Sequence, residues 1–330
     1  MIPTIIIVSV VAVGIVLFFV IQARVTAGKK EKLSPEAKTL NKKAAKLHGL
    51  AKKGDGEAAF NLYLMGKENL TVKGFKDKYK EYWTHLERAA KRGYPQAQYE
   101  YGLSKLYLNG ALAVPYLEKA AEAGVIKASL ALVRFYDTLS IGIKYDNFTS
   151  PDKKTCIELK AKWLEVAAEA GDDEAQASLG FLLLNELKDT RGALYWFEKA
   201  ADKENSSGFL GAAQIYEKRG GYEKALKYYT LAAKQDYTSA QYMLGKFYLG
   251  DYAYDKEKAL FWLNKAAEKG DIAATPAMDF LAQAYENGEI VEADPEKAAQ
   301  WRKSIEKAFA DFRKRNDKIE AKAEKDLQDG

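Results

Sequence analysis

One short phrase, an Ala-Ala pair that follows a bulky apolar residue and precedes a turn, recurs along most of the chain. It reads KALFWLNKAAEKGD at residues 258–271, and its variants include RAAKRG, KAAEAG, VAAEAG, KAADKE and LAAKQD. Repetition at a period of about 20 to 50 residues is typical of repeat arrays, in which each unit buries its apolar face against its neighbours. This feature constrains the fold more than any other property of the sequence.

A second phrase, Ala-x-x-x-Leu-Gly, marks seven registers that lie 31 to 47 residues apart. The registers begin at Ala58, Ala97, Ala128, Ala175, Ser206, Ala240 and Ala277. In the sixth register, Ala240, Leu244 and Tyr248 recur every four residues and predict one apolar stripe along a helix. Gly245 would sit inside that helix at a cost of about 1 kcal/mol relative to Ala. A Gly that recurs at this position predicts the close approach of another helix.

The Ala-Ala phrase itself predicts a second helix in each unit. Ala259, Trp262, Leu263 and Ala266 share one face at helical spacing, and Gly270 suits a left-handed residue after the helix ends. One unit of two helices has nothing to bury this face against. When copies stack, each buries this face against its neighbour, which explains why several copies are present.

These phrases resemble a known family. ALYWFEKAA (193–201), KALFWLNKAAEKG (258–270) and AQASLGFLL (175–183) are similar to Sel1-like repeats, which are related to tetratricopeptide repeats. The resemblance covers residues 46–309 and implies an all-α, right-handed α-solenoid of about seven helix-turn-helix repeats that serves as a protein-binding scaffold. It implies no catalytic residues. The family's Gly-rich loop between the two helices is mostly missing here.

The first segment differs in kind from the repeats. Residues 2–23 carry no charge, and at about 1.5 Å per residue this run is long enough to cross a bilayer core of about 30 Å. We therefore expect one transmembrane helix before the solenoid. A cleaved signal peptide, with VTA at 25–27 as its cleavage site, is the alternative. By the positive-inside rule, the basic residues that follow this run place the repeats in the cytoplasm. These residues are Arg24, Lys29, Lys30 and Lys32.

Positive charge is concentrated beside this apolar run. Residues 24–53 hold ten basic and two acidic side chains, whereas the whole chain is only +5, so residues 54–330 carry a net charge of −3. Such a basic segment fits anionic lipid headgroups, or else serves only as a solvated flank. Nucleic-acid binding is not expected, because the folded part is not basic. The expected organisation is an anchor (1–23), a basic linker (24–45), the solenoid (46–315) and a charged tail (316–330).

The period breaks in the third unit, where 47 residues separate two registers. The excess lies in the insertion Ser140 to Thr155. Insertions in solenoids often lie on a binding face, although a tolerated surface loop is the simpler explanation. Near the C-terminus, Asp294-Pro295 predicts a helix start. The apolar residues of that helix are expected to dock on the last repeat: Trp301, Ile305, Phe309 and Phe312.

Signatures of catalysis are absent from the sequence. It has no phosphate-binding loop, no HExxH, no GxSxG and no GxGxxG, so we expect no cofactor, no metal site and no enzyme activity. His48 and His85 lie in different repeat units, and His85 takes the place that Trp262 has in its own repeat, which predicts a packing role. Cys156, the only cysteine, is predicted to be a buried small hydrophobe.

Three functional interpretations remain open at this stage. A membrane-anchored adaptor would gather one or more partner proteins on the solenoid. The same fold on the other side of the membrane, periplasmic or extracellular, would be an envelope assembly factor that binds proteins or polysaccharide. An enzyme would need a cluster of His or carboxylate side chains from several repeats, which the sequence does not indicate.

Overall fold

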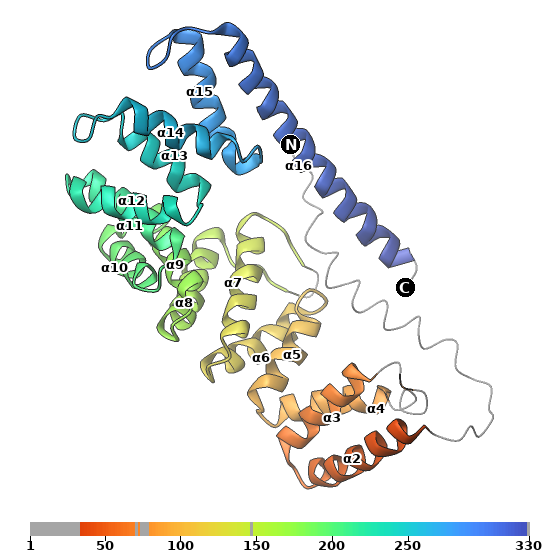
Figure 1. Cartoon of the computed structure of the whole chain (residues 1–330). Coiled ribbons are helices and arrows are strands. Elements are labelled where there is room, and N and C mark those ends of the chain that lie inside the picture. Colours follow the sequence, from red (N-terminus) through yellow and green to blue (C-terminus); the bar gives the residue numbers. More distant parts are fainter. Residues whose placement is uncertain (1–33, 70–71, 73–78, 146–147, 329–330) are drawn as a thin grey trace. The chain divides into compact units, whose positions relative to one another are not determined.

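The computed structural model describes residues 34–69, 72, 79–145 and 148–328, and within these ranges the chain forms fifteen α-helices (Figure 1). These residues divide into two compact units. Unit 1 ends at Ala170, and unit 2 is Gly171–Lys325.

Unit 1 contains α2 (Pro35–Lys52), α3 (Gly56–Glu68), α4 (Tyr79–Lys91), α5 (Pro95–Lys105), α6 (Gly110–Glu122), α7 (Ile126–Ser140) and α8 (Lys153–Glu169). Unit 2 contains α9 (Asp173–Asn185), α10 (Thr190–Ala201), α11 (Ser206–Lys218), α12 (Tyr222–Lys234), α13 (Thr238–Phe247), α14 (Lys256–Ala267), the short η3 (Ile272–Ala274), α15 (Thr275–Asn287) and α16 (Pro295–Gln328). Consecutive helices pack on each other from α2 to α8 and from α9 to α15. The seven predicted registers fall on the odd-numbered helices α3 to α15, and each is followed by a partner helix. The prediction of an all-α solenoid of seven helix pairs is confirmed; its right-handed winding stays a prediction.

The recurring glycines lie where two helices of a pair touch. A Cβ at Gly245 of α13 would lie 2.7 Å from Cγ of Leu263 and 3.1 Å from the carbonyl oxygen of Ala259, both in α14. A Cβ at Gly102 of α5 would likewise lie 2.8 Å from Cγ of Leu117 in α6. The predicted close approach is confirmed, and it explains why these helices accept a residue with low helix propensity.

The helix ends are fixed by side-chain caps and left-handed turn residues that can be recognised in the sequence. Side-chain oxygens of Asp172, Asn205 and Asp255 accept hydrogen bonds from the first turns of α9, α11 and α14. Gly270 follows α14 with a positive φ of 67°, the left-handed conformation predicted for it. The corresponding residues after α10 and α12 are Glu204 and Asp236, which adopt the same conformation with φ of 60° and 64°.

The helical array begins before the predicted solenoid boundary. α2 starts at Pro35, inside the stretch 24–45 that the sequence assigned to a linker, and it buries Ala37 and Ala44. The predicted anchor (1–23) and its flanking Arg24, Lys29, Lys30 and Lys32 lie outside the described residues. Within the described part of the chain, no helix has both the length and the apolarity needed to cross a bilayer.

The last helix docks over only part of its length. Asp294 caps it as predicted, and Trp301 and Ile305 pack against the core of the last repeat. The prediction was wrong for Phe309 and Phe312, which are 47% and 40% exposed. The reason is length: α16 has 34 residues and spans about 51 Å, whereas the 13 residues of α15 span about 20 Å. The stretch 316–328, predicted as a tail, continues this helix.

Candidate functional site

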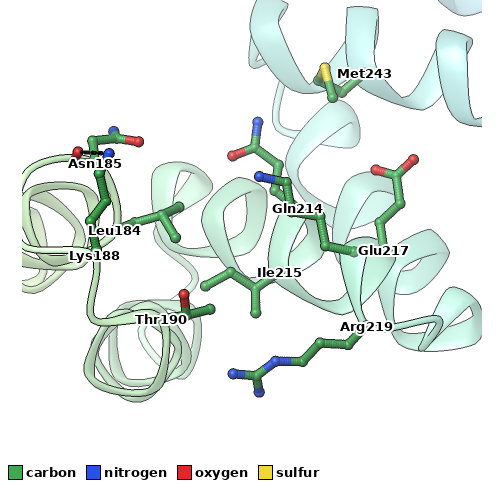
Figure 2. A pocket seen from close by; sticks show the side chains of 10 residues that line it. Leu184, Asn185, Lys188, Thr190, Gln214, Ile215, Glu217, Arg219 and Met243 are labelled. Atoms are coloured by element: carbon green, nitrogen blue, oxygen red, sulfur yellow. Dashed lines mark hydrogen bonds between the residues drawn. The ribbon is translucent and has the colours of Figure 1, made fainter.

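A pocket of about 680 Å³ opens in unit 2 between three consecutive repeats (Figure 2). Its lining comes from the end of α9, the start of α10, the end of α11 and the middle of α13. The lining residues are Leu184, Asn185, Lys188, Thr190, Gln214, Ile215, Glu217, Lys218, Arg219 and Met243. A volume between about 300 and 1,000 Å³ is typical of ligand-binding pockets. Because three repeats contribute side chains, the pocket exists only when the repeats are stacked.

The inner part of the pocket is apolar. Ile215 is buried, and Leu184 packs against the core cluster to which Ile215 belongs. Figure 2 shows Leu184 and Ile215 between the two sides of the pocket, with Met243 on a separate helix. Met243 is half-buried and belongs to the neighbouring core cluster. These three side chains offer a patch that would take an aliphatic or aromatic group.

The rim of the pocket is mainly cationic. Lys188, Lys218 and Arg219 are exposed, and all three stand at or just after the C-terminal ends of α9 and α11. Cations at these ends are favoured by the helix dipole. The Nζ of Lys188 donates to the carbonyl oxygen of Asn185. Among the described residues, no hydrogen bond or ion pair engages the side chains of Lys218 or Arg219, so both are available to a ligand.

The one acidic residue in the lining is already engaged. Glu217 accepts a hydrogen bond from the buried Tyr229 hydroxyl, with 2.6 Å between the oxygens. Burial, together with this bond to a carboxylate, raises the pKa of Tyr229, so its hydroxyl remains a donor at neutral pH. The carboxylate of Glu217 is therefore held by the core, and the pocket as a whole carries more positive than negative charge.

The arrangement suits binding rather than reaction. The lining contains no histidine, cysteine or serine, and its only hydroxyl is Thr190. A nucleophile needs a base within hydrogen-bond reach, and the lining offers no such pair. In the residues that the structure describes, no group of three or more His, Cys, Asp or Glu side chains could hold a metal ion. Cations, amides and an apolar floor together would recognise a carboxylate-bearing chain.

The insertion Ser140 to Thr155, the candidate binding segment of the sequence analysis, folds back on its own repeat. Between α7 and α8, Tyr145 stacks on Phe135 with 5.5 Å between ring centroids, and Phe148 meets Phe135 edge-on at 5.1 Å. Both rings pack against the core cluster of unit 1. The two aromatic residues anchor the insertion within unit 1, and none of its residues is among those that line the pocket of unit 2. Its role in protein binding stays a prediction.

The two histidines, which the sequence places in different repeats, are in contact within unit 1. Nδ1 of His48 in α2 lies 3.2 Å from Nε2 of His85 in α4, and the rings meet edge-on. His85 is 1% exposed, as its predicted packing role requires. Cys156 is fully buried beside Leu159 and Trp163, and burial raises the pKa of its thiol, which disfavours the reactive thiolate.

Sequence reasoning missed the pocket itself. Its chemistry comes from residues that look ordinary along the chain: two amides, one turn lysine and the basic pair that ends α11. The available signal was the phrase YEKRGG at 216–221, where two cations end an odd-numbered helix and a Gly-Gly turn follows. Which neighbours face that pair depends on how the repeats stack, and the sequence does not state this.

Comparison with known proteins supports the repeat assignment. The Sel1 repeat model matches residues 95–125, 161–172, 173–205, 215–237, 238–271 and 275–301. Chitin synthase regulatory factor 3 of Schizosaccharomyces pombe is 28% identical over 79% of this chain, which spans only 29% of that relative's length. A Sel1 repeat protein from Oxalobacter formigenes superposes with a TM-score of 0.52 and 26% identity over 74% of this chain and 96% of its own. A protective antigen of uropathogenic Escherichia coli strains is 26% identical over 79% of this chain and 63% of its own, with a TM-score of 0.46.

Proposed function

We propose that this chain, which contains Sel1 repeats along both units, is a non-catalytic scaffold that binds partner proteins through its stacked helices. The observation that carries the proposal is the pocket, which three consecutive repeats of unit 2 build together. A binding surface of this kind is what stacking adds to a repeat, because no single helix pair contains it. Its lining provides recognition groups and no catalytic pair.

The similarity to a regulatory protein supports this proposal. The fission yeast relative is named a regulatory factor, and a regulatory role fits a binding surface better than an active site. Because this chain spans 29% of that relative, we carry over only the general class of function and not its target.

The test is site-specific photo-crosslinking in cells. A photo-reactive amino acid replaces Gln214 in the pocket, and in a matched strain it replaces Lys227, an exposed residue of α12 outside the pocket. We expect discrete protein adducts from position 214 and none of the same mass from position 227. Adducts from neither position, or identical adducts from both, would contradict a scaffold that acts through this surface.

The finer proposal is that the scaffold is held at a membrane with its repeats in the cytoplasm. Its support is the uncharged run 2–23 and the basic residues Arg24, Lys29, Lys30 and Lys32. An anchor would raise the local concentration of the pocket for partners at the same membrane. The basic segment 24–53 would add contacts to anionic headgroups.

Two C-terminal fusions test this orientation. One carries a fluorescent protein that matures only in the cytoplasm, and the other carries a phosphatase that is active only outside it. We expect fluorescence without phosphatase activity. Phosphatase activity without fluorescence would overturn the cytoplasmic orientation and favour an assembly factor on the envelope side, whose partners could include polysaccharide.

A further inference from the structure

We propose that the pocket of unit 2 binds a short, extended, acidic segment of a partner protein and places one apolar side chain of that segment on its floor. This inference rests on the proposed function and specifies the class of partner. It follows from three properties of the lining: its charge, its amide groups and its apolar patch.

Charge complementarity favours an acidic ligand. Lys188, Lys218 and Arg219 line the pocket, and the only carboxylate of the lining, that of Glu217, is held by the hydroxyl of Tyr229. Figure 2 shows Arg219 reaching from the end of α11 on the Thr190 side of the pocket. A guanidinium can bind a carboxylate through two parallel hydrogen bonds, and an ammonium adds a point charge beside it. The pocket therefore offers room for at least one carboxylate.

The amide side chains favour an extended backbone. Asn185 in α9 and Gln214 in α11 both line the pocket. Each carries a donor and an acceptor, so each could pair with the N–H and C=O groups of a peptide. A helix uses these groups internally, whereas an extended segment leaves them free. Packed helices lie about 8 to 10 Å apart, so a segment that crosses from α9 to α13 needs about six residues at about 3.3 Å each.

The apolar floor favours one apolar side chain between the acidic residues of the bound segment. Ile215 is buried, and Leu184 and Met243 are half-buried around the pocket. A leucine or phenylalanine placed there would remove this apolar surface from water. Met243 is unbranched and adapts to different side-chain shapes, so the pocket would tolerate several such residues.

A long polyanion fits this surface less well than a short segment does. The part of the chain from residue 54 onward has a net charge of −3, so it carries no overall excess of positive charge beyond local groups such as this rim. Nucleic-acid affinity depends on many phosphate contacts along a basic surface. A peptide with two or three carboxylates can pair with the three cations of the lining and needs no longer basic surface.

Direct binding of a synthetic peptide to the full chain tests the inference. The probe is a fluorescein-labelled 12-residue peptide of Glu and Ser with one central Leu, and the matched peptide has Gln in place of every Glu. Fluorescence anisotropy is measured with the protein in uncharged detergent micelles. We expect the acidic peptide to bind at least about tenfold more tightly than the glutamine peptide, with an affinity that falls as salt rises.

Pocket variants separate this site from the basic N-terminal segment, which could also attract the probe. K218Q with R219Q should lower the affinity about tenfold or more, because neither side chain has a hydrogen-bond or ion-pair partner among the residues that the structure describes. The matched control, K227Q with K234Q, removes two exposed charges from α12 and should change it less than about twofold. E217Q keeps the acceptor for Tyr229 but removes a negative charge, so it should raise the affinity about threefold.

A gain from E217Q is a readout that mere unfolding would not produce, and circular dichroism checks that every variant stays helical. Equal binding of both peptides, or an affinity unchanged in K218Q with R219Q, would overturn the acidic-segment assignment. If position 214 still crosslinks to a protein in cells while the acidic peptide fails to bind, the scaffold function stands and only the class of partner segment falls.

Discussion

Two buried phenylalanines, one in each unit, are held in different ways. Phe135 of unit 1 is surrounded by other rings, among them Tyr107, Tyr145 and Phe148 at centroid distances of 6.4, 5.5 and 5.1 Å. Phe197 of unit 2 meets one ring, that of Phe181 at 4.8 Å between centroids, and also lies against the backbone of two glycines. A Cβ added to Gly180 in α9 or to Gly211 in α11 would lie 2.7 or 2.4 Å from its ring.

The difference shows two ways to fill the space between repeats. In unit 2 the glycines let α9 and α11 approach the ring of Phe197 directly, so the sequence pattern of the repeat sets the helix spacing. In unit 1 the corresponding position of α7 is Val133, and Tyr145 and Phe148 of the insertion pack around Phe135. The ring of Phe197 depends on small residues of the repeat pattern, and the ring of Phe135 depends mainly on a loop that interrupts the pattern.

Removing either ring has the largest expected effect. Phe197→Ala and Phe135→Ala each delete a fully buried aromatic side chain, and each should lower the free energy of unfolding by about 3 to 5 kcal/mol. Chemical denaturation of the full chain, monitored by circular dichroism, measures the loss. A loss below about 1 kcal/mol at either position would mean that the neighbouring groups collapse into the space, and the comparison would fail there.

The glycine contact sharpens the comparison with an effect of intermediate size. Gly211→Ala places a methyl group on the ring of Phe197, and overpacking of this kind costs about 1 to 3 kcal/mol. The same exchange at Gly49 in α2, which has nothing within 4 Å, should stabilise the chain by about 0.5 to 1 kcal/mol through helix propensity.

A double-mutant cycle identifies the cause. Gly211→Ala made in the Phe197→Ala background should cost little, because the ring that its methyl group would meet is gone. An equal cost in both backgrounds would mean that the methyl group clashes with something other than Phe197, and close backbone approach to that ring would not explain the glycine.

Sequence periodicity predicted what each repeat does internally. The fifth-position residues of all seven registers are buried, and Gly102, Gly180, Gly211 and Gly245 lie at close contacts. Contacts of this kind depend on which residues share one helix face. That can be read from the sequence, because such residues recur every three or four positions. The docking of α16 was predicted only in part. The spacing of its apolar residues shows which side chains share a face, but it does not show where the neighbouring helix ends.

Contacts between repeats were beyond the reach of the same reasoning. His48 and His85 are 37 residues apart, and the pocket joins residues from Leu184 to Met243. Their meeting depends on the rotation from one helix pair to the next and on loop lengths, which a local pattern leaves open. The anchored insertion was missed for a related reason: Tyr145 and Phe148 look like ordinary loop residues until the space beside Phe135 is known.

A smaller loss is expected when the insertion is released. Phe148→Ala removes a half-buried ring from Phe135 and Gly110, and it should cost about 1 to 2 kcal/mol. It should also speed proteolysis between α7 and α8, because the loop loses an anchor. Ile141→Ala, which changes a 63% exposed side chain in the same loop, is the control and should stay within about 0.5 kcal/mol of the parent. Unchanged proteolysis of the Phe148 variant would show that the ring does not anchor the loop.

The smallest effect concerns the turns that join one repeat to the next. In unit 2, Asp236 accepts hydrogen bonds from Lys269 and Gln241, and these contacts lower the pKa of its carboxyl below the ordinary value of 3.8. A depressed pKa means that the contribution to stability is present above the ordinary value and is lost as the pH falls below it. In unit 1 the corresponding residues after α2, α4 and α6 are Gly54, Gly93 and Gly124, which have no side chain to link repeats.

Asp236→Asn removes this charge and keeps the left-handed turn, which Asn tolerates. We expect a slightly lower Tm than the parent at pH 7, and a difference that shrinks as the pH falls through the lowered pKa of the parent carboxyl, because the parent then loses its charge as well. The effect is small because the ion pair is exposed to solvent.

Glu204→Gln, at the equivalent left-handed position after α10, is the control and should show no such pH dependence, because no ion pair engages Glu204 among the described residues. If both variants lose stability with the same pH profile, net charge rather than the contacts of Asp236 is responsible. The contrast between the Asp236 turn of unit 2 and the glycine turns of unit 1 would then have no energetic weight.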